Sequence, residues 1–207
     1  MSNIVVLISG NGSNLQAIID SVQNGAIDGR VSAVISNKPD VYGLERATRA
    51  NIPAIVVDHT QFASRSDFEQ ALIKTIDQYQ PDLVVLAGFM RILSSEFVQH
   101  YLGTMLNIHP SLLPKYPGLD THKRVLENGD KEHGTSVHFV TAELDGGPII
   151  AQRSIHVTAD DTEQTLQQKI QQQEHKLYSQ VVSWFCSGRL QFKNGQAWLD
   201  QQPVKLS

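Results

Sequence analysis

The sequence predicts an α/β protein with a Rossmann-like three-layer fold built on a mostly parallel sheet. Short β-branched runs alternate with longer segments of helical period, a pattern typical of βαβ units. The runs at 3–8 and 31–36 are nearly continuously apolar, as in strands that helices cover on both faces. Further strands are expected at 54–57 and 83–87. The first half of the chain should therefore form parallel strands with helices between them.

The pattern changes after Pro81. Strand-like runs at 104–108, 134–140 and 147–157 lie close together, and only 119–128 has a short helical pattern among them. Closely spaced strands without long helices between them favour antiparallel pairing. We therefore expect mixed or antiparallel additions to the sheet in the C-terminal half.

A long terminal helix is expected from Thr162 to Phe185, with Asp161 or Thr162 as its N-cap and Gly188 after its last turn. Apolar residues recur on it at helical spacing, at positions 166, 170, 177, 181 and 184. Glu174 interrupts this stripe, so its carboxylate should point toward the protein and need a partner there. Ligand hydroxyls, a buried salt bridge or a frayed stripe each explain this position.

Length and composition favour one globular domain. The chain has 207 residues, 41% hydrophobic and 18% charged, as ordinary globular proteins have. Its formal net charge of -4 lacks the basic excess that nucleic-acid binding demands. The single cysteine, Cys186, forms no internal disulfide, which favours a reduced compartment and a packed thiol. Because no apolar run is long enough for a membrane span, a cytoplasmic protein is expected.

The turn after the first strand is rich in glycine. The segment 9–14, SGNGSN, joins an apolar strand to a helical pattern, so free backbone N–H groups should meet at a helix N-terminus. Glycine permits close approach of an anion, and Ser13 and Asn14 can add donors. A phosphate monoester would suit this turn, although a strand-to-helix turn without a ligand has the same composition. The turn lacks the Walker A Lys-Ser/Thr pair and the third dinucleotide glycine, which argues against ATP and NAD.

Asn107 and His109 lie two residues apart at a predicted strand end, so their side chains leave the same face of the sheet. An amide can stabilise an oxyanion, and an imidazole can exchange a proton at neutral pH. Asp145 lies in an Asp-Gly turn, and turn geometry alone would explain it. A carboxylate near His109 would nevertheless favour the imidazolium that a general acid requires. A structural histidine is the alternative, and the eight histidines lack metal-ligand spacing, so no metal is expected.

Four stretches of the chain resemble the folate-dependent phosphoribosylglycinamide formyltransferases. They are ISGNGSNL at 8–15, LAGFMRIL at 86–93, NIHPSLLP at 107–114 and HGTSVH at 133–138. Their order is that of the family, and the resemblance covers nearly the whole chain. It implies the formyltransferase fold as one catalytic domain over 1–207, with a phosphate-binding half at about 1–100 and a folate-binding and catalytic half at about 101–188.

The resemblance also implies a reaction and its catalytic residues. The amine of 5-phosphoribosylglycinamide (glycinamide ribonucleotide) would take the formyl group of 10-formyltetrahydrofolate, a step of de novo purine (IMP) synthesis that releases tetrahydrofolate. The family's catalytic trio falls on Asn107, His109 and Asp145. Asn107 and protonated His109 would stabilise the oxyanion, His109 would act as general acid, and Asp145 would keep His109 charged and oriented. No covalent enzyme intermediate and no metal are implied.

The ligand contacts follow from the same resemblance. Gly12, Ser13 and Asn14 would hold the phosphate of the ribonucleotide. Its ribose and glycinamide end would meet Gln171, Gln172, Gln173 and Glu174. The residues implied to bind the folate are Arg65, Met90, Arg91, Ile92, Leu93, Asn107, Thr141, Ala142, Glu143, Leu144 and Asp145. The loop 117–122 is similar to a segment that closes over the ligands, but Asp120 stands where the resemblance leads us to expect histidine.

Three other functions compete with this interpretation. Formyltetrahydrofolate hydrolases and aminoacyl-tRNA formyltransferases share the Asn-x-His and Asp core, but each would need a further domain for which 207 residues leave no room. A non-catalytic sensor of a phosphoribosyl ligand would leave Asn107, His109 and Asp145 unexplained. The expected partners are the small molecules glycinamide ribonucleotide and formylfolate, with no nucleic acid and no membrane. The expected assembly is a monomer or a weak homodimer.

Overall fold

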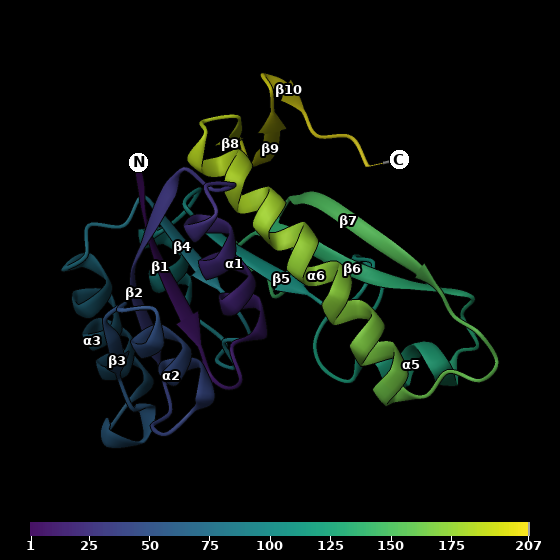
Figure 1. Ribbon diagram of the computed structural model, residues 1–207, viewed down its shortest axis with the longest axis horizontal. Helices are drawn as coiled ribbons and strands as arrows, with labels where there is room; N and C mark the ends of the chain where they lie inside the picture. Colours follow the sequence, from purple (N-terminus) through teal and green to yellow (C-terminus); the bar gives the residue numbers. More distant parts are fainter. Residues whose placement is uncertain (207) are drawn as a thin grey trace.

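Strand β1 (Ser2–Ile8) lies inside a seven-stranded sheet in the computed structural model, which describes residues 1–206 (Figure 1). The strand order is β3-β2-β1-β4-β5-β6-β7. The other strands are β2 (Gly29–Ser36), β3 (Ala54–Val56), β4 (Leu83–Leu86), β5 (Met105–His109), β6 (Glu132–Phe139) and β7 (Ile149–His156). The first five strands in this order, β3, β2, β1, β4 and β5, are parallel, whereas β6 is antiparallel to both of its neighbours, β5 and β7. The predicted α/β class with antiparallel additions is confirmed.

Helices cover both faces of the sheet, so the molecule has three layers with the sheet in the middle. The helices are α1 (Ser13–Gln23), α2 (Tyr42–Arg49) and α6 (Glu163–Cys186) on one face, and α3 (Arg65–Asp77) and α4 (Ser95–His100) on the other. Strand β1 feeds both cores, because successive side chains of a strand point to opposite faces. Ile4, Val6 and Ile8 pack with the first set of helices, and Val5 and Leu7 with the second. Each buried aliphatic side chain contributes roughly 1.5–3 kcal/mol, which explains the unbroken apolar run.

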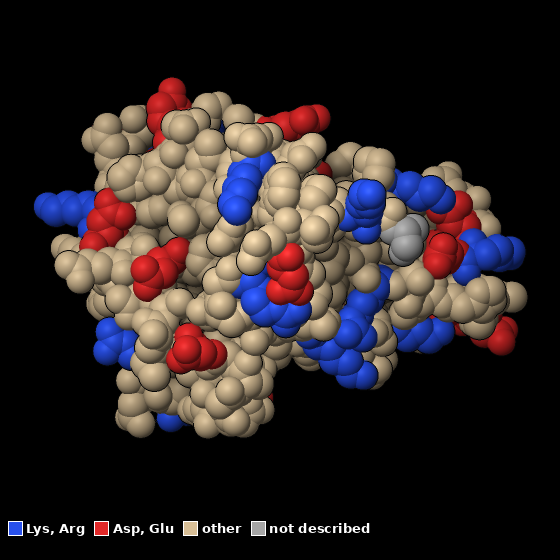
Figure 2. All heavy atoms as spheres, turned by 90° about the horizontal axis from the view of Figure 1, so that it is seen from above, with Lys and Arg blue, Asp and Glu red and all other residues tan. Residues whose placement is uncertain are grey.

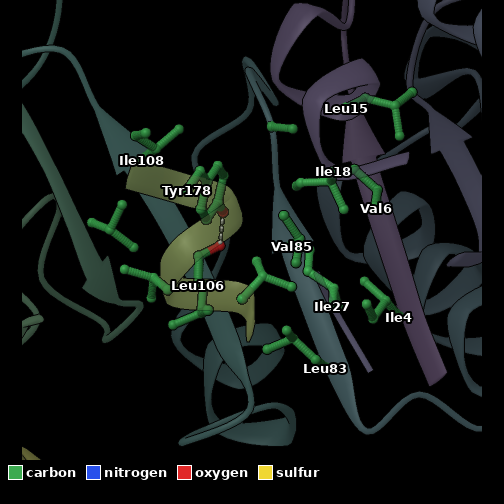
Figure 3. Packing of buried hydrophobic residues seen from close by; sticks show 14 of the residues in the cluster. Ile4, Val6, Leu15, Ile18, Ile27, Leu83, Val85, Leu106, Ile108 and Tyr178 are labelled. Atoms are coloured by element: carbon green, nitrogen blue, oxygen red, sulfur yellow. Dashed lines mark hydrogen bonds between the residues drawn. The ribbon is translucent and has the colours of Figure 1, made fainter. Parts of the chain in front are cut away.

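Helix α6 packs over β4 and β5, and its Tyr178 side chain lies beside Leu106 (Figure 3). Tyr178 of this helix is fully buried. Its hydroxyl donates to the carbonyl oxygen of Leu86 at 2.8 Å and lies 3.0 Å from that of Leu106. Because Asn107 directly follows Leu106, the helix is anchored beside a predicted catalytic residue. Of the two predicted N-caps, Asp161 and Thr162, it is Thr162 that caps this helix, because its side chain accepts from the backbone N–H of Thr165.

The structure contains elements that the sequence pattern does not predict. After Pro81 a single short helix is expected, but α4 accompanies α5 (Thr121–Glu127). Helix α4 has only six residues, too few for helical periodicity to be visible. Beyond Gly188, for which no role is predicted, a small antiparallel sheet packs against the end of α6. Its strands are β8 (Leu190–Lys193), β9 (Gln196–Leu199) and β10 (Gln202–Pro203).

Charged side chains of both signs lie on the face of the molecule that Figure 2 presents. Figure 2 shows Lys and Arg side chains beside Asp and Glu side chains across the face that it presents. This mixture agrees with the small net charge of -4. No helix among residues 1–206 is long and apolar enough to cross a bilayer.

Candidate active site

An open cavity of about 990 Å³ lies where the carboxyl ends of β1, β4 and β5 meet. These strands run parallel, so the loops that follow them emerge at the same edge of the sheet. Strand β1 pairs with β2 on one side and with β4 on the other. The strand order therefore reverses there, and ligands of open α/β sheets bind at such a switch point. The cavity is the strongest candidate for a substrate site.

Most of the predicted site residues line this cavity. They are Gly12, Ser13, Asn14, Met90, Arg91, Ile92, Leu93, Asn107, His109, Thr141, Ala142, Glu143, Leu144, Asp145, Gln171 and Glu174. Three other predicted site residues do not line the cavity: Arg65, Gln172 and Gln173. Gln171 and Glu174 are three residues apart and share one face of α6. The two glutamines between them project from other faces of the helix.

Arg65, the first residue of α3, is held by an acidic side chain outside the cavity lining. Its Nε donates to Glu69 Oε1 at 3.0 Å. The buried Glu69 carboxylate also accepts from the backbone N–H of Ser94 at 2.8 Å and from the Ser94 hydroxyl. Ser94 follows the cavity segment 90–93 and caps α4. Glu69 therefore ties Arg65 to the end of the predicted folate segment.

His109 ends β5 and is buried. Its Nε2 lies 2.8 Å from the carbonyl oxygen of Tyr116. Since a carbonyl oxygen only accepts, Nε2 is the donor. Its Nδ1 lies 3.5 Å from Asp145 Oδ2, which is within ion-pair distance but longer than a normal N–H···O bond. Both ring nitrogens therefore face oxygen atoms, and only Nε2 is fully engaged.

Asp145 connects His109 to the loop that contains Gly118. Its Oδ2 accepts from the Gly118 N–H at 2.9 Å, and its Oδ1 lies 3.8 Å from His138 Nε2. The backbone of Asp145 is left-handed, with a φ of 51°, a conformation in which Asp is several-fold enriched among non-glycine residues. The predicted Asp-Gly turn thus also brings the carboxylate to His109.

Asn107 receives its orientation from His138 on the neighbouring strand. Nδ1 of His138 lies 2.9 Å from the Phe139 carbonyl oxygen and must donate to it. Burial lowers the pKa of His138, which favours the neutral ring, in which Nε2 carries a lone pair. Asp145, whose Oδ1 lies 3.8 Å away, acts to raise the pKa of His138, but burial has the larger effect and the pKa stays lowered. Nδ2 of Asn107, 3.3 Å from Nε2, is therefore the donor.

Two histidines form a hydrogen-bonded pair beside the cavity. His122 Nδ1 and His133 Nε2 are 2.9 Å apart and share a hydrogen bond. Burial lowers the pKa of both rings, and it lowers that of His133 to about 4, with the neighbouring His122 charge acting in the same direction. Among residues 1–206, no group of three or more His, Cys, Asp or Glu side chains is arranged to hold a metal ion.

The glycine turn leaves the start of α1 open. Gly12 is the N-cap with a φ of 75°, and no side chain within residues 1–206 caps the helix there. A Cβ on Gly12 would lie 2.9 Å from the Cα of Gly43, so both the backbone conformation and the space require glycine. The first N–H groups of α1 are available to a ligand. Together with the helix dipole they form a site suited to an anion.

Glu174 and Asn14 meet at the same end of the cavity. Glu174 is only 7% exposed, as its place on the apolar stripe predicts. Its Oε2 accepts from Asn14 Nδ2 at 3.1 Å, and burial raises the pKa of Glu174 against the lowering effect of this bond. Oδ1 of Asn14 is buried and has no hydrogen-bond partner among residues 1–206. The structure thus gives Glu174 a neutral partner in place of a salt bridge.

The mouth of the cavity is apolar and exposed. Its large apolar side chains are Met90 (61% exposed), Ile92 (67%), Leu119 (68%) and Leu144 (56%). Such a patch is typical of a binding surface. Behind it, the Met90 N–H donates to Ser9 Oγ at 2.8 Å, and Ser9 Oγ donates to Asn37 Oδ1 at 2.5 Å. This buried chain fixes the segment 90–93 to the ends of β1 and β2.

Sequence reasoning missed His138 and the Ser9 chain. A signal for His138 exists, because Ser136 and His138 alternate with Val137 and Phe139 and give β6 a polar face at its end. Ser9 lies inside the glycine segment, but nothing near it in sequence indicates that it contacts Met90. Both contacts depend on which strands become neighbours.

Comparisons with known proteins agree with this fold. A family model described as formyl transferase matches residues 2–182. The chain is 60% identical over 200 residues to phosphoribosylglycinamide formyltransferase of Escherichia coli (strain K12), which covers 97% of this chain and 94% of that protein. It is also 48% identical over 187 residues to the trifunctional purine biosynthetic protein adenosine-3 of Drosophila melanogaster, which covers 89% of this chain and 14% of that protein.

A solved structure gives the same result in three dimensions. The phosphoribosylglycinamide formyltransferase of Coxiella burnetii, solved in complex with CHES, superposes with a TM-score of 0.95 and 54% identity, over 99% of this chain and 96% of that one. The family match covers most of the chain and includes the glycine turn and the cluster of Asn107, His109 and Asp145. The chain therefore belongs to the formyl transferase family.

Proposed function

We propose that the chain is an enzyme that transfers the formyl group of 10-formyltetrahydrofolate to the amine of 5-phosphoribosylglycinamide in de novo purine biosynthesis. The products are N-formylglycinamide ribonucleotide and tetrahydrofolate. The observation that carries this proposal is that one cavity joins an open helix N-terminus, an Asn-His-Asp cluster and an apolar mouth. The names of the relatives from E. coli and D. melanogaster support the choice of substrate and pathway. One catalytic domain over 1–207 contains all three parts.

The ribonucleotide binds at the α1 end of the cavity. Its phosphate accepts from the backbone N–H groups of Gly12, Ser13 and Asn14, where the helix dipole favours an anion. The carboxylate of Glu174 accepts from the ribose hydroxyls, and the partnerless Asn14 Oδ1 is a further acceptor beside it. Gln171, one turn earlier on the same face of α6, contacts the glycinamide end.

The folate occupies the apolar end of the cavity. Its pterin lies between the segments 90–93 and 141–145, where backbone groups bind its edges and Met90, Ile92 and Leu144 cover its faces. Arg65 lies outside the cavity lining and meets the carboxylate of the glutamate tail, which extends beyond the pterin slot. The Glu69 carboxylate uses Nε of Arg65 and leaves the ends of the guanidinium free for that contact.

The catalytic cluster stabilises the oxyanion that forms when the substrate amine attacks the formyl carbon. Asn107 uses one Nδ2 hydrogen for His138 and offers the other to the oxyanion. Nε2 of His109 is occupied by the Tyr116 carbonyl oxygen, so Nδ1 is the ring nitrogen that serves the reacting atoms. When the bond from the formyl carbon to N10 breaks, His109 gives a proton to N10, and the proton that the amine releases replaces it. Asp145 balances the charge of the imidazolium.

The test is an assay of the purified full chain with 10-formyltetrahydrofolate, with and without glycinamide ribonucleotide, in which the deformylated folate is followed by absorbance. Turnover that requires the ribonucleotide is the expected result. Equal turnover without it would identify a hydrolase. His109→Ala should abolish turnover while leaving the dissociation constants of both substrates within about threefold of the wild type. Ligand binding without turnover in the wild type would point to a sensor.

A further inference from the structure

Helix α2 packs directly against the back of the glycine turn. The Gly43 N–H donates to the Gly10 carbonyl oxygen at 3.0 Å. A Cβ on Gly12 would lie 2.9 Å from the Cα of Gly43, and a Cβ on Gly43 would lie 3.0 Å from the Gly10 carbonyl oxygen. The first turn of α2 therefore touches the backbone that the proposed phosphate site uses.

Arg46, one turn further along α2, adds side-chain hydrogen bonds between the helix and the turn. Its Nε donates to the Asn11 carbonyl oxygen at 2.8 Å, and Nη2 donates to Asn11 Oδ1 at 2.9 Å. Its Nη1 donates to Gln16 Oε1 at 3.3 Å. The guanidinium also lies over the Tyr42 ring, 4.6 Å from the ring centroid. This planar group is thus held in one orientation by three oxygen acceptors and by stacking on the Tyr42 ring.

The contact with Asn11 determines the direction of the next N–H. The carbonyl of Asn11 and the N–H of Gly12 belong to one peptide plane, in which a trans bond points them in opposite directions. Since Arg46 Nε holds the carbonyl oxygen on the α2 side, the Gly12 N–H points away from α2. Gly12 lines the cavity. The arginine contacts the turn from behind and orients its ligand-binding face.

The charge of Arg46 is not neutralised by these contacts. Its three hydrogen-bond partners are uncharged oxygen atoms. The pKa of His175, next to Glu174 on α6, is lowered first by burial and then by the Arg46 charge. The positive charge therefore acts across the turn, where a phosphate dianion would be attracted to it.

We infer that Arg46 is a positioning residue for the phosphate: it orients the Gly12 N–H through the Asn11 carbonyl and adds a positive charge behind the turn. This inference rests on the proposed function, because that function places a phosphate at Gly12. It adds a residue that does not line the cavity and that acts only through the turn. Its effect should therefore be confined to binding of the phosphorylated substrate.

The test compares Arg46→Met with Arg49→Met. Arg49 is on the same helix and also lies over the Tyr42 ring, at 5.4 Å, but it pairs with Glu45. In R46M we expect the KM for glycinamide ribonucleotide and the dissociation constant of inorganic phosphate, measured by calorimetry, each to rise about tenfold. The kcat and the KM for 10-formyltetrahydrofolate should stay within about twofold. R49M should match the wild type, and Arg46→Lys, which keeps the charge without the fork, should be intermediate.

Three outcomes would overturn the inference. In the first, R46M has wild-type phosphate affinity and ribonucleotide KM. In the second, R46M raises the KM for both substrates equally, which would make Arg46 a general structural residue. In the third, R49M loses as much phosphate affinity as R46M. Melting temperatures check folding, and R46K gives the same comparison if R46M does not fold. A wild type that binds phosphate but has no turnover contradicts the proposed function, while the phosphate titrations still decide the role of Arg46.

Discussion

Nδ2 of Asn107 lies 3.3 Å from Nε2 of His138, across the antiparallel pair of β5 and β6, where the two residues are register partners. A neutral imidazole with its hydrogen on Nδ1 accepts only at Nε2. His138 therefore decides which end of the Asn107 amide faces the cavity. This relationship makes the proposed oxyanion donor depend on a residue 31 positions away in sequence.

His138→Phe should lower kcat about tenfold, less than the 10²–10³-fold loss typical of deleting an oxyanion donor, because Asn107 remains but loses its fixed orientation. The KM values of both substrates should stay within about twofold. His138→Gln supplies an oxygen acceptor and should recover most of the rate. Steady-state kinetics of the three proteins check this. Equal losses in the Phe and Gln variants would contradict the role given to His138.

Asp145→Asn should reduce kcat by about 100-fold or more with little change in KM, because the carboxylate charge beside His109 is lost. The asparagine oxygen can still accept from Gly118, so the loop contact persists. Glu132→Gln is the matched control, since Glu132 is an exposed carboxylate outside the cavity lining. A wild-type kcat in the Asp145 variant would remove this residue from the mechanism.

Stability should fall as the pH decreases from about 6.5 to about 4. The pKa values of His133, His122 and His138 are lowered in the folded protein, that of His133 to about 4. Below about pH 6.5 the unfolded chain therefore binds protons that the folded chain does not. Each such histidine lowers the free energy of unfolding by up to about 1.4 kcal/mol per pH unit.

Urea unfolding at several pH values measures this slope. His133→Gln should reduce the slope by up to about 1.4 kcal/mol per pH unit, the equivalent of one proton, because glutamine does not titrate. Glutamine can still hydrogen-bond to His122, so the local contact is kept. An unchanged slope in that variant would mean that His133 does not contribute. Above about pH 7 the free energies of unfolding of the two proteins should no longer diverge with pH.

Tyr178→Phe should lower the free energy of unfolding by about 1–3 kcal/mol. The change leaves the carbonyl oxygens of Leu86 and Leu106 without the buried hydroxyl that now reaches both. Tyr42→Phe is the control, because the Tyr42 side chain is exposed. Loss of its hydroxyl should change the free energy of unfolding by less than about 0.5 kcal/mol. Urea unfolding compares the two, and equal effects would show that the Tyr178 bonds contribute nothing.

The sequence by itself determined the features that depend on neighbouring residues. Strand and helix periodicity and local turn chemistry account for the apolar runs of β1 and β2, the start of α6 at Asp161 or Thr162, the glycine turn and the place of Glu174 on the inner face of α6. The motifs NIHP and LDGG also locate Asn107, His109 and Asp145. Short-range order of this kind is independent of how the strands are arranged.

Only the tertiary structure decided the partners of these residues. Asn14 bonds Glu174 across 160 positions, and Arg46 holds Asn11 across 35. Sequence patterns place each residue on a face of its element but do not indicate which element packs against that face. The order of the strands in the sheet brings the ends of β1, β4 and β5 together. It therefore brings separate local signals into one cavity, with the proposed phosphate site at one end, the cluster of Asn107, His109 and Asp145 in it and an apolar mouth.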